Sequence, residues 1–317
     1  MSSPSKTELR ELTPEERTQY FRGVQDIWGG GLAQDKFVAF QRRLAAAPEA
    51  KGRYRMFGLF PRGDGTLLSG MKAYEFEGSF RGAPLRILGI GAVFTPSRLR
   101  KRGYAARMLH LAMERFQAGG ADAALLFSDI GSSYYERLGF NAVESGEAVV
   151  EAQALPRMSG FRRAEPGDEA AMSDLFESAR AVGAFSLSRD GWALRFQLRR
   201  LRELARARNQ GEPEWGFVVE GTAGEAAAVV RLSRDAVDVL EAAWTSETAR
   251  DRLLGGLRDF LGRWDRTRLR VWPTSLLRGL FAPSPRGSAI AMVAPLSAGV
   301  RLPRAEDPAD VSLLDHI

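Results

Sequence analysis

One short segment of the chain combines residue types that suit the binding of a phosphate group. Apolar residues at 85–94 lead into a basic turn, and residues 102–118 follow with apolar positions at helical spacing. Gly103 and Ala105 lack bulk, so the N–H groups of the first helical turn can approach an anion closely. The helix dipole adds about half a positive charge there, and the basic residues at 100–102 add Coulomb attraction. The segment predicts an anion site, and an arginine-capped helix start is the alternative.

The segment also resembles a known signature. Arg100-Lys101-Arg102-Gly103-Tyr104-Ala105 is similar to the pyrophosphate-binding motif of the GCN5-related N-acetyltransferases, (Arg or Gln)-x-x-Gly-x-(Gly or Ala). Residues 127–140 resemble the next strand and helix of that family, which end in a Tyr-Glu-x-x-Gly-Phe element. The resemblance covers roughly residues 7–155. It implies an α/β protein with a mixed sheet, the acyl-CoA N-acyltransferase fold, and acetyl-CoA as cosubstrate.

The resemblance implies which residues hold the cofactor. In the family, the fourth and fifth strands splay apart, and the pantetheine arm pairs with backbone of the fourth strand, where an N–H group can also serve the oxyanion. Ser128 stands where the family commonly has Asn, and Gly131 where it has Ala. The predicted cofactor-binding residues are Val93, Phe94, Thr95, Arg100, Lys101, Arg102, Gly103, Tyr104, Ala105, Ala106 and Ser128.

Two side chains are predicted to move protons during the reaction. The departing thiolate needs an acid, and a tyrosine with a pKa of about 10 suits a thiol with a pKa of about 8.5. Tyr135 matches the acid position of the family, packing being the alternative, whereas Tyr134 is predicted to lie in the core. For the base that deprotonates the amine we predict Glu75, which shares one strand face with Glu77. A solvent-facing pair and a base at Asp129 are the alternatives.

Three further parts of the chain contain residues whose type and position indicate a role. His110 lies beside the apolar stripe of its predicted helix, so we assign it a structural role. Some two-domain relatives, the enhanced intracellular survival type acetyltransferases, bring their C-terminus to the active site, which by analogy makes Asp315, His316 and the carboxylate of Ile317 candidates. Trp28 lies between the first two predicted helices, where relatives form part of the acceptor pocket, and core packing is the alternative.

The chain is long enough for two domains, and its pattern repeats. Its 317 residues allow two adequate cores. Thr13, Pro14 and Glu16 form a capping-box pattern at a helix start, and residues 161–169 echo that strand and helix start. The later link at 245–248, before another predicted helix, contains neither glycine nor arginine. We therefore predict a catalytic domain at residues 1–157 and a degenerate GNAT-like domain, without the phosphate loop, at residues 158–317.

Composition excludes several classes of function. Hydrophobic residues make up 44% and charged residues 26%, with no apolar run long enough for a membrane span and no export signal, so we expect a cytoplasmic protein without a membrane partner. Zero cysteines and two histidines argue against a metal site. The net charge of +6 suits an anionic partner, but interspersed acidic residues disfavour nucleic acid. Residues 195–208 are predicted to form a solvated helix face, and oligomeric state is not predicted.

Together these features predict an N-acetyltransferase that moves the acetyl group of acetyl-CoA to a primary amine by direct attack in a ternary complex. The expected acceptor is a small molecule such as an amino acid or an aminoglycoside. Free lysine is included because the arrangement also resembles fungal-type lysine N-acetyltransferases. The alternative is a noncatalytic module that binds and senses acyl-CoA.

Overall fold

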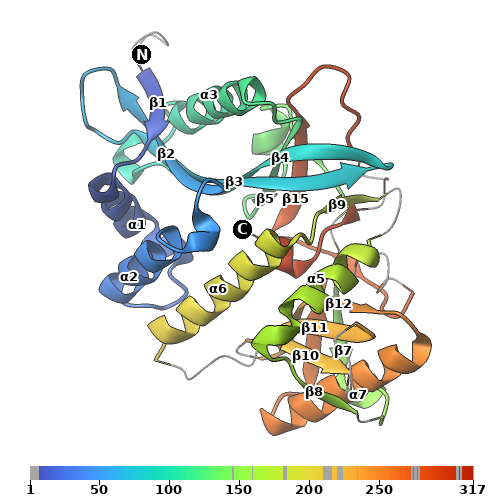
Figure 1. Cartoon of the computed structure of the whole chain (residues 1–317). Coiled ribbons are helices and arrows are strands. Elements are labelled where there is room, and N and C mark those ends of the chain that lie inside the picture. The colour runs from blue at the N-terminus through green and yellow to red at the C-terminus, as the bar shows by residue number, and fades with distance from the viewer. Residues whose placement is uncertain are drawn as a thin grey trace.

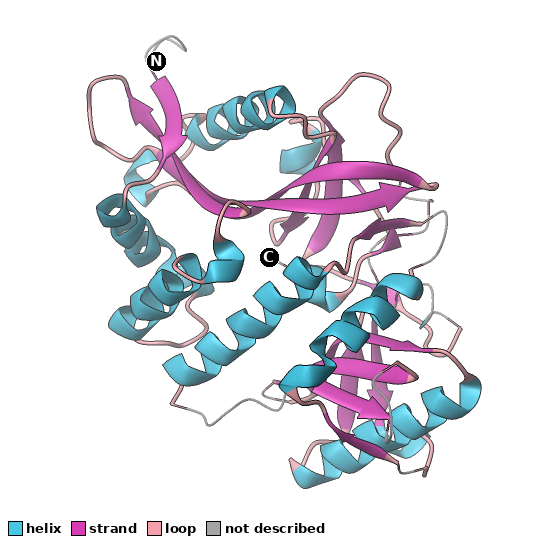
Figure 2. Ribbon diagram, in the orientation of Figure 1, coloured by secondary structure: helices cyan, strands magenta, loops and turns pink. Residues whose placement is uncertain are grey.

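The protein is a mixed α/β structure with two β-sheets, each covered by helices (Figures 1 and 2). The computed structural model describes residues 7–144, 146–158, 160–180, 184–209, 216–219, 224–233, 235–272, 274, 277, 279–304, 307 and 309–316. The first elements are β1 (Thr7–Glu11), α1 (Pro14–Trp28), α2 (Gln34–Ala45), η2 (Pro48–Ala50), β2 (Tyr54–Pro61), β3 (Ser69–Phe80), β4 (Ala83–Phe94), η3 (Ser97–Leu99), α3 (Tyr104–Ala118), β5 (Ala123–Ser128), α4 (Ser133–Glu136), β6 (Asn141–Ala142) and β7 (Gly146–Glu151).

The later elements repeat this order in part. They are η4 (Ala152–Ala154), β8 (Phe161–Arg163), η5 (Pro166–Asp168), α5 (Glu169–Ser178), β9 (Phe185–Leu187), α6 (Gly191–Ala207), β10 (Gly216–Val219), β11 (Ala226–Leu232), β12 (Val237–Trp244), α7 (Glu247–Arg263), β13 (Arg268–Val271), β14 (Ser284–Pro285), β15 (Ile290–Pro295), β16 (Ala309–Asp310) and η6 (Leu313–Asp315). No helix in these described ranges has both the length and the apolar character that crossing a membrane requires.

Local sequence signals set the helix starts. The Thr13 hydroxyl accepts from the Glu16 N–H at 3.3 Å, and the Glu16 carboxylate accepts from the Thr13 N–H at 2.9 Å, so the predicted capping box is confirmed and α1 begins at Pro14. The helix predicted at residues 102–118 is present as α3, but it begins at Tyr104, directly after the left-handed Gly103. Strands β2, β3 and β4 pair antiparallel in chain order and form a meander.

The first sheet opens between β4 and β5. Its order is β1-β2-β3-β4-β5-β15-β6, with β9 beside β3 and β16 beside β9. The parallel register of β4 and β5 runs from Ile87↔Ala123 to Ile90↔Leu126. Beyond Ile90, β4 continues to Phe94, while the last residues of β5 pair with β15 on the other side. The splay that the family resemblance implied is therefore present.

The two halves of the chain exchange strands, and the first sheet contains β9, β15 and β16 of the second half. The second sheet has the order β14-β7-β13-β12-β11-β10-β8, so residues 146–151 pair with a strand of the second half. In return, residues 290–295 lie between β5 and β6 in the first sheet. The sequence did not indicate this exchange.

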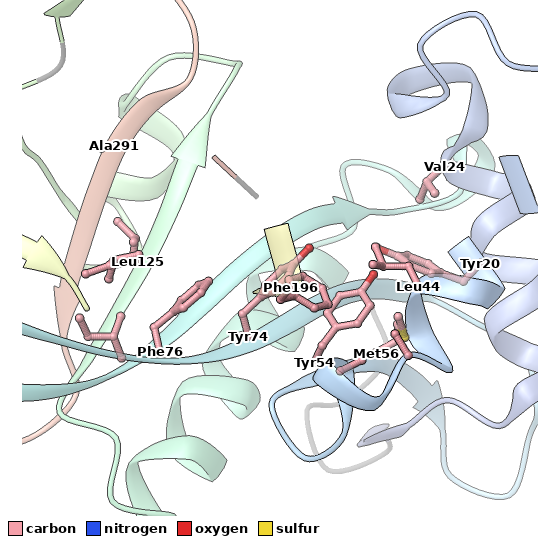
Figure 3. Close-up of a cluster of buried hydrophobic side chains, with 14 of the residues drawn as sticks. Tyr20, Val24, Leu44, Tyr54, Met56, Tyr74, Phe76, Leu125, Phe196 and Ala291 are labelled. Carbon is pink, nitrogen blue, oxygen red and sulfur yellow. The ribbon is translucent and has the colours of Figure 1, made fainter. Parts of the chain in front are cut away.

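Helix α6 of the second half packs against the first sheet. The ring of Phe196 lies 5.1 Å from that of Tyr54 and 6.1 Å from that of Tyr74 between centroids, and Figure 3 shows the three side chains together. Helix α3 covers the opposite face, where Met108 and Leu109 pack with Met71. The first sheet thus lies between α3 on one face and α1, α2 and α6 on the other (Figure 1).

Candidate active site

A cavity of about 610 Å³ lies at the gap between β4 and β5. Its lining includes the start of α3 on one face of the sheet and parts of α2 and α6 on the other, so the cavity reaches both faces. Among the predicted cofactor-binding residues, Val93, Phe94, Thr95, Arg100, Lys101, Gly103, Tyr104, Ala105 and Ala106 line it. Arg102 is exposed outside the lining, and Ser128 also lies outside it.

The α3 end of the cavity has the geometry of an anion site. Gly103 adopts a left-handed conformation with φ of 79°, and helix α3 has no side-chain N-cap. The first helical hydrogen bond runs from the Arg107 N–H to the Gly103 carbonyl at 2.9 Å, so the N–H groups of residues 104–106 precede it. The Arg100 guanidinium donates to the Thr95 carbonyl at 3.2 Å and ties the turn to the end of β4. The N–H groups of the first helical turn and the basic side chains of the turn therefore lie together, as anion binding requires.

A β-bulge shapes the middle of the cavity. Gly70 pairs with Phe94 and Lys72 with Gly91, so the register skips Ala92 and Val93, and Ala92 has φ of 46°. The buried Tyr20 hydroxyl donates to the Ala92 carbonyl at 2.5 Å and fixes the bulge. Because a bulge takes residues out of the strand ladder, the backbone at 92–93 can serve a ligand in the gap.

Tyr135 lies in the wall of this cavity and is 9% exposed. Burial, followed by the neighbouring Tyr134 and Asp129, raises the pKa of Tyr135 to about 12. Its phenol is therefore protonated at neutral pH, as a proton donor must be. Tyr134 was expected in the core, but it is half-buried and lines the same cavity, with its ring 5.0 Å from that of Tyr135.

Glu75 lies away from this cavity, which corrects the expectation that it reaches the cleft. Its carboxylate pairs with Arg55, and it lines a separate cavity of about 330 Å³ together with Glu77. Because side chains alternate along a strand and Tyr74 lines the main cavity, Glu75 points to the other face of the sheet. We do not retain it as the base. Asp129 is the one carboxylate among the described lining residues, and it accepts from the Ala289 N–H at 3.0 Å.

Ser128 shapes the loop that follows β5. Its hydroxyl donates to the Gly131 carbonyl at 2.5 Å and accepts from the Ile130 N–H at 3.3 Å, while the side chain is almost completely buried. The structure therefore gives Ser128 a part in the turn and does not bring its side chain to the cavity. His110 is exposed on α3 and pairs with Glu114, consistent with a role outside the site.

The C-terminal segment reaches the cavity through His316. Asp315 is anchored by Arg189, whose guanidinium bonds both carboxylate oxygens at 2.7 and 2.8 Å and also binds Glu241 at 2.6 Å. This buried cluster positions the next residue, His316, in the cavity wall. Burial, with the nearby arginines, lowers the pKa of His316 to about 3, so its ring is neutral. Ile317 lies outside the described residues.

On the side of the sheet away from α3, the cavity contains two residues that the sequence did not single out, Lys72 on β3 and Arg200 on α6. Trp28, 38% exposed, also lies in the cavity wall, where the sequence placed it as a pocket residue, and not in the core. Arg200 departs from the solvated face expected for residues 195–208. A signal existed for Lys72, because it shares the apolar strand face of Tyr74 and Phe76.

The comparisons with known proteins agree with this geometry. Residues 8–143 match the family model of the acetyltransferase (GNAT) domain. No curated protein sequence matches the chain significantly.

Three solved structures share the fold across both halves. An Enterococcus faecalis V583 protein of unknown function, described as a "Probable N-Acyltransferase", has a TM-score of 0.67 and 16% identity, covering 90% of this chain and 71% of that chain. A GCN5-related N-acetyltransferase from Kribbella flavida has a TM-score of 0.65 and 18% identity, covering 92% and 72%. Eis1 from Mycobacterium abscessus has a TM-score of 0.55 and 17% identity, covering 92% and 73%.

These similarities support the fold, and the family model covers the part of the chain that holds the splayed strands and the uncapped helix. Residues 8–143 are therefore similar in sequence to the acetyltransferase (GNAT) domain, and the chain shares the fold of the solved GCN5-related N-acetyltransferases.

Proposed function

We propose that this protein is an acetyl-CoA dependent N-acetyltransferase that acts on a primary amine by direct attack in a ternary complex. The observation that carries the proposal is one continuous cavity that joins an uncapped, basic helix start to a protonated tyrosine through a gap in the sheet. Catalysis is assigned to residues 1–157, and residues 158–317 form the second, GNAT-like domain, apart from the exchanged strands.

In this proposal the cofactor diphosphate lies against the N–H groups at 104–106, next to Arg100 and Lys101. The pantetheine arm then follows β4 at residues 93–95 into the gap. A backbone N–H at the bulge is the candidate donor to the oxyanion, because it is already released from the strand ladder. Acetyl-CoA supplies the acetyl group as a thioester, and no metal is part of the proposal.

The amine nitrogen forms a bond to the thioester carbonyl carbon, and the carbon–sulfur bond breaks when the tetrahedral intermediate collapses. The electron pair leaves with sulfur, and the Tyr135 hydroxyl gives its proton to the thiolate of coenzyme A. The ammonium form of the acceptor must lose one proton before attack, and the nitrogen gives up a second proton as the intermediate collapses to the amide. One of the two restores the Tyr135 phenol through solvent and the other is released. Asp129 is our candidate to take the first proton, directly or through water, because it is the carboxylate available in the described lining.

Thiol release from acetyl-CoA in the presence of a panel of amines tests this function. We expect release with at least one small primary amine and an increase in melting temperature with acetyl-CoA alone. Stabilisation by acetyl-CoA without release for any amine would instead favour a noncatalytic acyl-CoA sensor. The absence of both would exclude the proposed cofactor site.

A further inference from the structure

The acceptor end of the cavity is positively charged. Lys72, Arg200 and Arg208 line it, on the face of the sheet that α2 and α6 cover. The described lining residues include one acidic side chain, Asp129, which follows β5 and is held by the N–H group before β15. His316, the remaining titratable group at this end besides the tyrosines, is neutral because burial lowers its pKa. A ligand amine therefore meets cations at this end.

Lys72 and Arg200 have only neutral hydrogen-bond partners among the described residues. The Lys72 ammonium donates to the Gln41 side-chain oxygen at 3.0 Å. The Arg200 guanidinium donates to the His316 carbonyl at 2.9 Å and to the Gln197 side-chain oxygen at 3.4 Å. Lys72 and Arg200 line the same cavity, and burial followed by the charge of Arg200 lowers the pKa of Lys72 to about 7, so an anion bound there would favour the charged form of Lys72.

A fully buried arginine of the same chain shows how a cation removed from water is usually compensated, whereas Lys72 and Arg200 are half-buried. Arg189 lies between the carboxylates of Glu241 and Asp315, which offset the cost of removing its charge from water. Burying a cation without such a partner is costly. Within the described part of the chain, the pair at the cavity thus has no carboxylate partner of the kind that Arg189 has.

The phosphates of the cofactor do not account for this pair. The N–H groups and basic turn that suit phosphate lie at the start of α3, which packs on the opposite face of the sheet. Lys72 is paired across the strands with Gly91, before the bulge, and Arg200 comes from α6 in the second half. The two cationic regions line one cavity from opposite faces of the sheet.

We infer that Lys72 and Arg200 form a carboxylate-binding subsite, and that the acceptor is a small amine that carries a carboxylate, such as an amino acid, and not a polycation. The inference rests on the proposed function, since it names the acceptor class of that site. The reactive amine then points toward the bulge while the carboxylate stays at the α6 end. Charge complementarity gives this orientation, and an aminoglycoside with several ammonium groups is repelled.

The spacing of residues on α6 explains how the second half supplies this subsite. Phe196, Arg200 and Leu204 are four residues apart and share one helix face. Phe196 packs on Tyr54 and Tyr74 of the first sheet, so Arg200, one turn further, is held at the cavity. The second domain therefore contributes a specificity residue to the acceptor site.

The first test compares amines that differ only by the carboxylate. With acetyl-CoA and the full-length protein, thiol release is measured for amino acids and their decarboxylated amines, such as lysine with cadaverine and phenylalanine with phenethylamine, and for an aminoglycoside such as kanamycin. We expect kcat/KM for the preferred amino acid to exceed that of its decarboxylated partner on the order of 10- to 100-fold, the usual effect of charged hydrogen bonds. Equal or better use of the decarboxylated amine or of kanamycin overturns the inference, as does failure of every amino acid.

The second test uses variants of the two cations. Lys72→Met and Arg200→Met should raise KM for the amino acid about tenfold or more and remove the preference over the decarboxylated amine. Lys72→Arg, which keeps the charge but cannot act as a base, should retain that preference; loss of kcat with unchanged KM would identify Lys72 as a base instead. Arg195→Met, at an exposed arginine of the same helix, is the matched control for loss of one charge.

The increase in melting temperature with acetyl-CoA distinguishes failure of the carboxylate subsite from failure of the proposed acetyltransferase function. If it persists in the variants while amino acid preference is absent from the wild-type protein, the inference fails and the proposed function stands. If neither stabilisation nor thiol release occurs, the proposed function itself fails.

Discussion

The two halves of the molecule contain equivalent helices whose starts differ in chemistry. Helix α3 begins at a left-handed glycine without a side-chain cap, beside basic residues. Helix α7, at the same place in the second half, is capped by the Ser246 hydroxyl, which accepts from the Ala249 N–H at 3.2 Å, and has Glu247 in its first turn. A helix start whose N–H group is already capped, and which carries an acidic residue, does not favour phosphate binding. The comparison shows how one scaffold gains or loses an anion site through its first helical turn.

The spaces beside the fourth strands differ in the same way. The register of β12 and β13 covers residues 237–239 with 269–271, although β12 continues to Trp244. There, η6 packs on β12 and Asp315 joins the buried cluster with Arg189 and Glu241. In the first half the corresponding space is the cavity. The second half thus uses its own C-terminal segment where the first half has room for a ligand.

Replacement of the glycine before α3 should have the largest effect. We expect Gly103→Glu to abolish the increase in melting temperature with acetyl-CoA, because it places negative charge at the anion site and strains a residue with φ of 79°. At a concentration of about 100 Kd the lost stabilisation is about 2.7 kcal/mol, together with all turnover. Gly103→Ala is the control, since a Cβ there meets nothing within 4 Å and the charge is unchanged. Normal stabilisation of Gly103→Glu by acetyl-CoA would remove the cofactor site from α3.

Breaking the buried cluster of the second half should mainly affect stability. Arg189→Met leaves Glu241 and Asp315 without their cation, so we expect the free energy of unfolding to fall by about 3–5 kcal/mol in urea denaturation. Arg195→Met should change it far less, because that arginine is exposed. A loss below about 1 kcal/mol for Arg189→Met would contradict the view that this cluster anchors the C-terminal segment.

Tyr135→Phe should lower kcat on the order of 10²-fold while leaving stabilisation by acetyl-CoA intact, because it removes the proton for the thiolate. Tyr134→Phe is the matched control on the same helix, and we expect a smaller decrease. The reverse order of the two effects, measured by thiol release at saturating substrates, would assign the acid to Tyr134.

The smallest effect concerns pH. The pKa of His316 is lowered from 6.5 to about 3, so between these values the unfolded chain binds a proton that the folded protein does not. Stability contributed by His316 is therefore present above pH 6.5 and lost as the pH falls, by about 1 kcal/mol between pH 6.5 and 5.5. His316→Gln should flatten this part of the stability curve in thermal unfolding at several pH values. An unchanged curve would show that the ring is accessible to protons in the folded protein.

Structural features that depend on neighbouring residues alone could be predicted from the sequence. The capping box at Thr13 and Glu16 and the glycine before α3 act within one helical turn, so their residues are sufficient. Glu75 was misplaced because alternation shows that Glu75 and Glu77 share a face but not which face the sheet turns to the cavity. That choice depends on packing with α3, α2 and α6, which no local pattern contains.

Contacts between distant parts of the chain could not be predicted from the sequence for the same reason. The strands at 146–151 and 290–295 have ordinary β patterns, and nothing in them specifies a partner in the other half. Arg200 is one of several arginines in the same helix, and the sequence alone does not distinguish it from the others. Only the packing of Phe196 on the first sheet distinguishes it from its neighbours.

The exchange of strands between the two halves affects the synthesis of the chain and the selection that acts on its gene. Because β15 covers β5, the first sheet stays incomplete until residues 290–295 have left the ribosome, and an uncovered β5 edge is prone to pair with other chains. Synthesis of β15 is therefore part of building the first sheet. A gene shortened after the first half would encode a sheet with an open side, so selection acts on both halves as a single unit.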